Sequence, residues 1–579
     1  MLIRQFLLST RVHLTLAFLP SWPSIGLQSQ ARPALREYDW ESAASHETLH
    51  WERCYEDRFE CARLTVPLDW NDKSNPNNVS LPLIRLPASI PRSDPHHGGT
   101  ILTNPGGPGG SGVWWATENA ERLQRQLRGT KDYDILSFDP RGIFRSRPNA
   151  YCFESAVESE IFADQKEAVG SLTSSEYALK FNWVAERALG EVCEGTENGK
   201  YADGDNIRRH MSTASVARDM LHIIDLLEQE KSHQLDSYSG QQKPLVAPKA
   251  KLQYFGTSYG TFLGQTFAAM YPDRVARMVL DSNVDPDNFV SRFEAGIDDH
   301  GAAREELLQL CFDAKTECAF HRGTDKSAED VKKRYDDLLD SLEVFPRYAH
   351  GEGRAMPITR ALVENGFMTT TYQPLWFFKL FAIFLNDLLS DKNPGIPFFE
   401  RVVPTQEAFT SARGREAYQA GETGTAVHCG DGPDLSNEPL SAFEDYLGNL
   451  TESFGRASAG IQAAYKVGCW TWPKSLRTAW RFAGPFEGNV SILFVNNRLD
   501  PATAAKNAAK MAERFHGSIF LMQNSIGHGA VWPSPSTCVE KYVREYMQDG
   551  TMPEKDTVCQ PPCQPFEAGC DVHEKLASW

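Results

Sequence analysis

Residues 253–262 read QYFGTSYGTF and place Ser258 between two glycines at the spacing G-x-S-x-G. The apolar residues before Gly256 predict a short strand, and residues 261–272 predict a helix that follows almost at once. A serine on a sharp turn between strand and helix can expose a nucleophilic hydroxyl at the edge of a parallel sheet. The same spacing also arises by chance in a long chain, so the surrounding sequence must support the interpretation.

Short apolar strands alternate with helices on both sides of this motif. Residues 50–86 alternate as strands do, and residues 212–229 carry apolar residues at helical spacing behind a Ser/Thr start signal. Further strands that run into polar loops are predicted at residues 96–112, 133–146, 274–286, 489–501 and 517–529. This alternation predicts an α/β fold with a mostly parallel central sheet flanked by helices.

The alternation stops between residues 290 and 480, which are helix-rich and aromatic. An insertion there would form a helical cap over the carboxyl ends of the strands, where ligands bind in open α/β sheets. We therefore expect a core in two parts, residues 29–289 and 481–579, with the cap at 290–480 and a disulfide-linked C-terminal tail. A chain of 579 residues is long enough for this arrangement.

Asp500 and His528 each follow a late predicted strand. A serine hydroxyl needs a base to take its proton, and the base needs a third group to orient it. The chain order Ser, Asp, His is that of the α/β-hydrolases. We expect Ser258 to be the nucleophile, His528 the general base and Asp500 its orienting group. Asp281 and His516 are weaker candidates, because Asp281 follows the strand next after the motif and His516 precedes its strand.

A serine hydrolase also needs N–H donors for the negative oxygen of its tetrahedral intermediate. One is expected from the amide of Tyr259, the residue after the nucleophile, and another from a loop after an earlier strand. The loop TNPGGPGGSG at 103–112 is suited to this, since Gly106 and Gly107 let the backbone approach a substrate closely, and we expect both glycines to contribute to the oxyanion hole. The loop does not predict a phosphate site, because no G-K-[ST] follows.

Several features predict a secreted protein. Residues 1–28 combine an early arginine, the apolar stretch LTLAFLP and small residues before Gln28, as a signal peptide does. Arg11 and His13 interrupt the apolar region, and a disordered tail is the alternative. Sequons for N-glycosylation occur at Asn78, Asn449 and Asn489.

Twelve cysteines also fit an oxidising compartment. They show no zinc-type C-x-x-C pairs and no accompanying histidine cluster, so we expect disulfides and no metal. Reduced buried cysteines are the alternative. Close pairs in the chain are Cys54/Cys61, Cys311/Cys318, Cys538/Cys559 and Cys563/Cys570.

Composition excludes other partners. A net charge of −17 would repel nucleic-acid backbones. The longest apolar stretch, residues 374–389, is too short to span a membrane and contains Lys379, so it predicts an amphipathic helix. We expect a monomer without cofactor, acting on a peptide or small ester.

The segments NPGGPGGSG, FDPRGIFRS, GTSYGTFLGQTFAAMYPDRVARMVLD, FVNNRLDPAT and GHG together resemble the secreted tripeptidyl-aminopeptidase-like α/β-hydrolases, relatives of the proline iminopeptidases. The resemblance covers nearly all of residues 50–565. It implies the same three catalytic residues, an oxyanion hole from the amides of Gly107 and Tyr259, and the disulfides Cys429–Cys469 and Cys538–Cys559. The tail CQPPCQPFEAGC has no clear counterpart, and its pairing stays open.

The resemblance favours an aminopeptidase that releases short N-terminal peptides. A carboxylate in the cap, with Glu294 and Asp299 as unranked candidates, would bind the terminal ammonium. The alternative is an esterase, thioesterase or lactonase for a small apolar metabolite, with Trp376, Phe377 and Phe381 either lining its pocket or packing as cap core. A serine carboxypeptidase and a non-catalytic binding protein fit less well.

Overall fold

The computed structural model describes residues 38–239, 249–293, 296–351, 354–390, 392–393, 412–531, 534, 536–567 and 570. The predicted signal peptide lies outside these residues. Within them, no helix is both long and apolar enough to cross a membrane.

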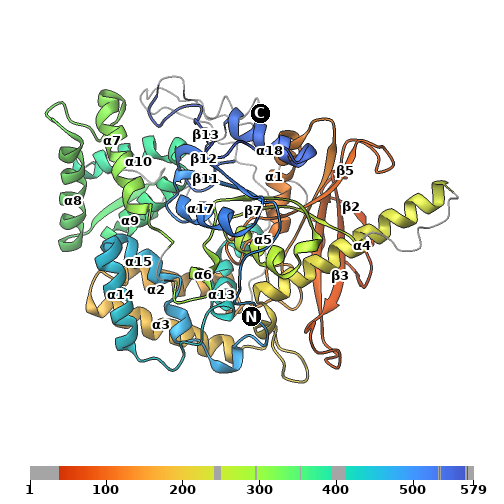
Figure 1. The fold of residues 1–579 in the computed structure, drawn as a ribbon. Helices are drawn as coiled ribbons and strands as arrows, with labels where there is room; N and C mark the ends of the chain where they lie inside the picture. The colour runs from red at the N-terminus through yellow and green to blue at the C-terminus, as the bar shows by residue number, and fades with distance from the viewer. Residues whose placement is uncertain are drawn as a thin grey trace, which may run out of the picture.

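A mostly parallel sheet forms the centre of the fold (Figure 1). Its strands are β1 (Ser45–His46), β2 (Glu52–Cys54), β3 (Phe59–Pro67), β4 (Asn78–Leu86), β5 (His97–Asn104), β6 (Asp132–Phe138), β7 (Leu252–Thr257), β8 (Val275–Asp281), β11 (Leu493–Leu499), β12 (Ile519–Ile526) and β13 (Val558–Cys559). The strand order is β1-β3-β4-β6-β5-β7-β8-β11-β12-β13, with β2 beside β3. From β6 to β13 along the sheet every pairing is parallel, and so is β1–β3. The pairings β2–β3, β3–β4 and β4–β6 are antiparallel.

Helices cover both faces of this sheet. They are α1 (Gly112–Leu127), α4 (Thr213–Ser239), α5 (Tyr259–Met270), α17 (Ala505–Arg514) and α18 (Thr537–Asp549). Residues of α1 and α18 share one buried apolar cluster with one face, and α4, α5 and α17 contribute to a cluster on the other. Because both faces are covered, β6 is buried at every residue, including the polar residues Asp132, Asp134 and Ser137.

Between β8 and β11, which are neighbours in the sheet, the chain forms a mainly helical segment. Its elements are α6 (Pro286–Phe289), α7 (His300–Ala314), α8 (Ala328–Val344), the hairpin β9 (Arg347–Gly351) and β10 (Arg354–Ile358), α9 (Arg360–Tyr372), α10 (Pro374–Leu389), α13 (Ala412–Asp431), α14 (Leu440–Phe454), α15 (Arg456–Ala464) and α16 (Val467–Trp470). Two earlier helices, α2 (Ala156–Ala168) and α3 (Glu176–Gly195), pack on α13 and α16. Figure 1 shows α2, α3, α14 and α15 gathered on one side of the molecule.

The predicted strands and helices are confirmed, including the amphipathic helix at 374–389, which is α10. All twelve cysteines are paired. The disulfides are Cys54–Cys61, Cys152–Cys193, Cys311–Cys318, Cys429–Cys469, Cys538–Cys559 and Cys563–Cys570. They include both pairs that the family resemblance implies and the close pair in the tail that the sequence left open.

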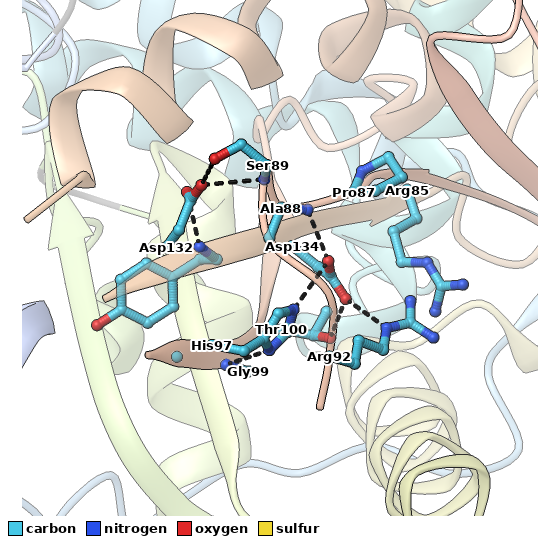
Figure 2. Close-up of polar contacts among 12 residues, drawn as sticks. Arg85, Pro87, Ala88, Ser89, Arg92, His97, Gly99, Thr100, Asp132 and Asp134 are labelled. Carbon is cyan, nitrogen blue, oxygen red and sulfur yellow. Dashed lines mark hydrogen bonds and ion pairs between the residues drawn. The ribbon is translucent and has the colours of Figure 1, made fainter. Parts of the chain in front are cut away.

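At the amino end of β6, a charged cluster holds the loop that leads into β5 (Figure 2). The buried Asp134 carboxylate accepts hydrogen bonds from the Ala88 amide at 2.8 Å and from Arg92 Nε at 3.0 Å, and lies 3.3 Å from His97 Nε2. Arg92 Nη1 also contacts Glu230 on α4 at 2.9 Å. Burial alone would raise the pKa of Asp134, but His97 and the two arginines Arg92 and Arg85 outweigh it and lower the pKa to about 2. This cluster lies at the opposite end of β6 from the loop that follows Phe138.

We expect Asp134→Asn to lower the free energy of unfolding by about 2–4 kcal/mol, since the partly buried Arg92 and the buried Arg85 then lose a neighbouring negative charge. The stabilisation by Asp134 should be complete above its ordinary pKa of 3.8 and be lost as the pH falls through 3.8 towards 2. Urea unfolding between pH 2 and 7 measures both effects. Asp94 is a half-buried carboxylate of the same loop that contacts only the neighbouring His96 among the described contacts, so Asp94→Asn should cost much less stability. Equal losses in both variants would contradict this role for the cluster.

Candidate functional site

Ser258 lies on the turn between β7 and α5 with φ 58° and ψ −127°. A positive φ is costly for a residue with a side chain, and strain of this kind concentrates at functional turns. The Ser258 amide donates to the Asp281 carbonyl at 3.0 Å, which ties the turn to the end of β8. Because Ser258 caps no amide of α5 with its side chain, the hydroxyl is left for other contacts.

The glycine-rich loop after β5 lies directly against this turn. A Cβ added to Gly106, whose φ is +101°, would come within 2.8 Å of Ser258 Cβ and 3.1 Å of the Tyr259 amide nitrogen. Gly107, Ser258 and Tyr259 line one cavity. Since Tyr259 begins α5, its amide is among the first-turn N–H groups that have no partner within the helix.

The expectation that Gly106 supplies an oxyanion donor is wrong. The Gly106 amide donates to the Asn104 side-chain oxygen at 2.9 Å, so its N–H is already committed. Gly106 instead contributes by having no side chain, which allows the backbone of the loop to lie against the turn at Ser258. Gly107 and Tyr259 remain as the candidate donors.

Asp500 and His528 lie at the carboxyl ends of β11 and β12 and contact one another. His528 Nδ1 is 2.9 Å from Asp500 Oδ1 and 3.1 Å from Oδ2. Asp500 Oδ1 also accepts the amides of Ala502 and Thr503, at 3.0 and 2.9 Å. These bonds hold the carboxylate in one orientation and leave the Nε2 side of the imidazole for a substrate or nucleophile.

Electrostatics favour the charged form of this pair. Burial alone would lower the pKa of His528, but the neighbouring Asp500 carboxylate outweighs it and the pKa is raised. Burial likewise opposes ionisation of Asp500, yet His528 and its hydrogen bonds lower the pKa of the carboxyl. The pair is thus arranged to stabilise a proton on the imidazole, as a general base requires in the transition state.

The two weaker candidates have other positions. The Asp281 carboxylate accepts the amides of Ala530 and Val531, at 2.8 and 3.0 Å, and so contacts the backbone after His528 rather than its ring. His516 lies before β12, at the opposite end of that strand, and its amide donates to Gly488. Asp500 is therefore the acid that contacts the imidazole.

The cavity beside Ser258 has a volume of about 70 Å³ and a mostly apolar wall. Val284, Phe289, Phe293, Ile297 and Met368 contribute to it. Tyr372, at the end of α9, lines the same cavity, and its carbonyl accepts the His528 amide at 3.0 Å. The helical segment after β8 therefore supplies both a wall of the cavity and support for the histidine.

A second cavity of about 250 Å³ adjoins the first, since Gly107, His428 and Tyr465 line both. Its wall carries the buried carboxylate of Glu422 on α13. Glu422 Oε2 accepts the amides of Cys152 and Phe153, whereas Oε1 has no hydrogen-bond partner among the described residues. Burial raises the pKa of Glu422, although a hydrogen bond with the Ser159 side chain, the two amides and the charge of Arg208 act in the opposite direction.

Glu186, from α3, also lines the second cavity and is paired with Lys166 of α2. The sequence singled out neither Glu422 nor His428. Their spacing of six residues on α13 puts them about 120° apart around the helix rather than on one face, so helical periodicity gave no signal that joined them.

Of the two acids considered for binding an ammonium group, Asp299 lines neither cavity and accepts the amide of Ala505 at 3.1 Å. Glu294 lies outside the described residues. Of the three aromatic residues considered for a pocket, Phe381 belongs to a buried apolar cluster and Phe377 packs against it. Neither lines the two cavities described above, so both act as packing residues.

The chain is similar in sequence to known hydrolases. Residues 456–559 match the family model of the TAP-like proteins. The chain is 25% identical to the serine protease Hip1 of Mycobacterium tuberculosis, over 86% of this chain and 87% of that protein. It is 25% identical to the tripeptidyl aminopeptidase of Streptomyces lividans, over 92% and 89%. It is 26% identical to carboxylesterase B of M. tuberculosis, over 86% of each.

The predicted resemblance is thereby confirmed, and the parallel sheet with helices on both faces is the predicted fold. Residues 456–559 thus resemble the TAP-like proteins, and most of the chain is similar to known hydrolases, on a mostly parallel sheet flanked by helices.

Proposed function

We propose that the protein is a secreted serine hydrolase in which Ser258 attacks a carbonyl carbon, His528 takes and then returns the proton, and Asp500 orients the imidazole. The observation that carries this is the buried contact between His528 and Asp500, at the same sheet edge as the strained Ser258 turn. The amides of Gly107 and Tyr259 would stabilise the oxyanion.

We further propose that the substrate is the free amino end of a peptide. The cap at residues 290–480, joined by α2 and α3, would restrict the site to a chain end. The acyl part would extend from the cavity beside Ser258 into the second cavity, where the unpartnered Glu422 Oε1 accepts a hydrogen bond from the terminal ammonium. Such a partner offsets the cost of a buried carboxylate, which the nearby amides reduce only in part.

An ester substrate is the second candidate. The cavity beside Ser258 is small and mainly apolar, which suits a short acyl chain, and one relative is named a carboxylesterase. The same catalytic residues would cleave an ester, so the chemistry of the acyl group separates the two proposals.

Secretion is supported by the six disulfides. Asn78, Asn449 and Asn489 are exposed, as carriers of N-linked glycans must be. We expect a monomer.

Ser258→Ala should lower hydrolysis by about 10⁶-fold and abolish labelling by a fluorophosphonate probe, because the hydroxyl that would attack the carbonyl carbon is removed. The measurement combines gel-based labelling with turnover of tripeptide, dipeptide and single-residue anilides and of short-chain esters. An unlabelled wild-type protein without turnover on any of these substrates would refute the serine hydrolase proposal.

Glu422→Gln should raise KM for peptide anilides with a free amino end by about 10- to 100-fold, since a hydrogen bond between charged groups is lost. Rates on short esters should stay the same. Glu186→Gln is the matched control in the same cavity, because Lys166 already neutralises Glu186. If Glu422→Gln slowed esters and peptides equally, Glu422 would have a structural role instead.

A further inference from the structure

Two consecutive residues at the end of β8, Asp281 and Ser282, connect the three residues to which we assign catalysis. Both are fully buried. The Asp281 carbonyl accepts the Ser258 amide, and its carboxylate accepts the Ala530 and Val531 amides directly after His528. A single residue thus fixes the nucleophile's turn and the loop that carries the histidine.

Ser282 completes these connections. Its Oγ accepts the Gly529 amide at 2.6 Å, and its hydroxyl donates to the Asp500 carboxylate. The Ser282 amide donates to the Val495 carbonyl of β11 at 2.9 Å. One small side chain therefore joins the loop of the base to the acid that orients the base.

The backbone at Ser282 is unfavourable for a serine. Its φ is 63°, in the left-handed region where glycine is favoured. If this position only had to turn the chain, glycine would make the turn without strain. The hydroxyl, which both accepts from Gly529 and donates to Asp500, is what a glycine there cannot supply.

We propose that Ser282 is a positioning residue for catalysis. Together with Asp281 it holds the His528 imidazole in the orientation that lets it contact both Asp500 and Ser258. The inference rests on the proposed serine hydrolase function. It assigns no contact with the substrate to either residue.

The charges around His528 determine which way its titration should move. Asp500 and Asp281 both raise the pKa of the imidazole, whereas burial lowers it. Asp281 itself has its pKa raised to about 6, first by burial and in part by Asp500. The other polar neighbours are Tyr372, with ring centroid 4.7 Å from His528, and Thr503, 3.3 Å from Nδ1. Loosening the contact with Asp500 leaves burial dominant, so the pKa of His528 falls.

The test compares Ser282→Ala, which removes the hydroxyl and keeps the strained φ, with Ser282→Gly, which removes both. We expect each to lower kcat by about 10- to 100-fold with KM within about twofold of wild type, as for lost orientation of a catalytic group. Because the base acts when neutral, the acid limb of the kcat/KM profile should move to lower pH in both. Ser282→Gly should melt at or above the temperature of Ser282→Ala.

Ser525→Ala is the matched control, since Ser525 is a buried serine on β12 whose hydroxyl donates only to the Ile526 carbonyl among the contacts described. It should keep wild-type kcat and the wild-type acid limb. A Ser282→Gly enzyme with wild-type kcat and acid limb would overturn the proposal, because the residue would then serve only the turn. The proposal would also be overturned if the Ser282 variants melted at a lower temperature than wild type but kept the wild-type acid limb of the kcat/KM profile. Failure of the serine hydrolase proposal is distinguishable, since Ser258→Ala would then keep its activity.

Discussion

The hydrogen bond between the buried Asp500 carboxylate and the His528 imidazole is the interaction on which the site depends. A carboxylate without solvent is stable only with several partners, and here two backbone amides, the Ser282 hydroxyl and the imidazole provide them. These partners come from three separate strand ends. The sheet therefore has to place β8, β11 and β12 side by side before the pair can exist.

The helical segment between β8 and β11 is tied to the same site. The Tyr372 carbonyl of α9 holds the His528 amide, and α13 approaches the glycine-rich loop so closely that a Cβ on Gly424 would come within 2.8 Å of the Pro108 carbonyl. The cavity wall and the support of the proposed general base therefore come from the same helical segment. Replacing one of its helices would alter both.

Local patterns were sufficient to predict the elements that carry the chemistry. Ser258, Asp500 and His528 each follow a short apolar strand, and parallel strands bring their carboxyl ends to one edge. The same reasoning erred at Gly106, because a glycine that permits close approach and a glycine that donates its amide have the same letter in the sequence. Only the Asn104 contact distinguishes them.

The sequence by itself determined the parallel sheet, the positions of its strand ends and the pairs of adjacent cysteines, because these follow from periodicity and spacing along the chain. Tertiary structure alone decided which groups meet between elements far apart in the chain: Glu422 with Cys152, Tyr372 with His528, and Asp281 with Ala530. Such contacts depend on how helices pack across the sheet edge. No local pattern of residues encodes that packing, since many apolar faces of similar size pack equally well.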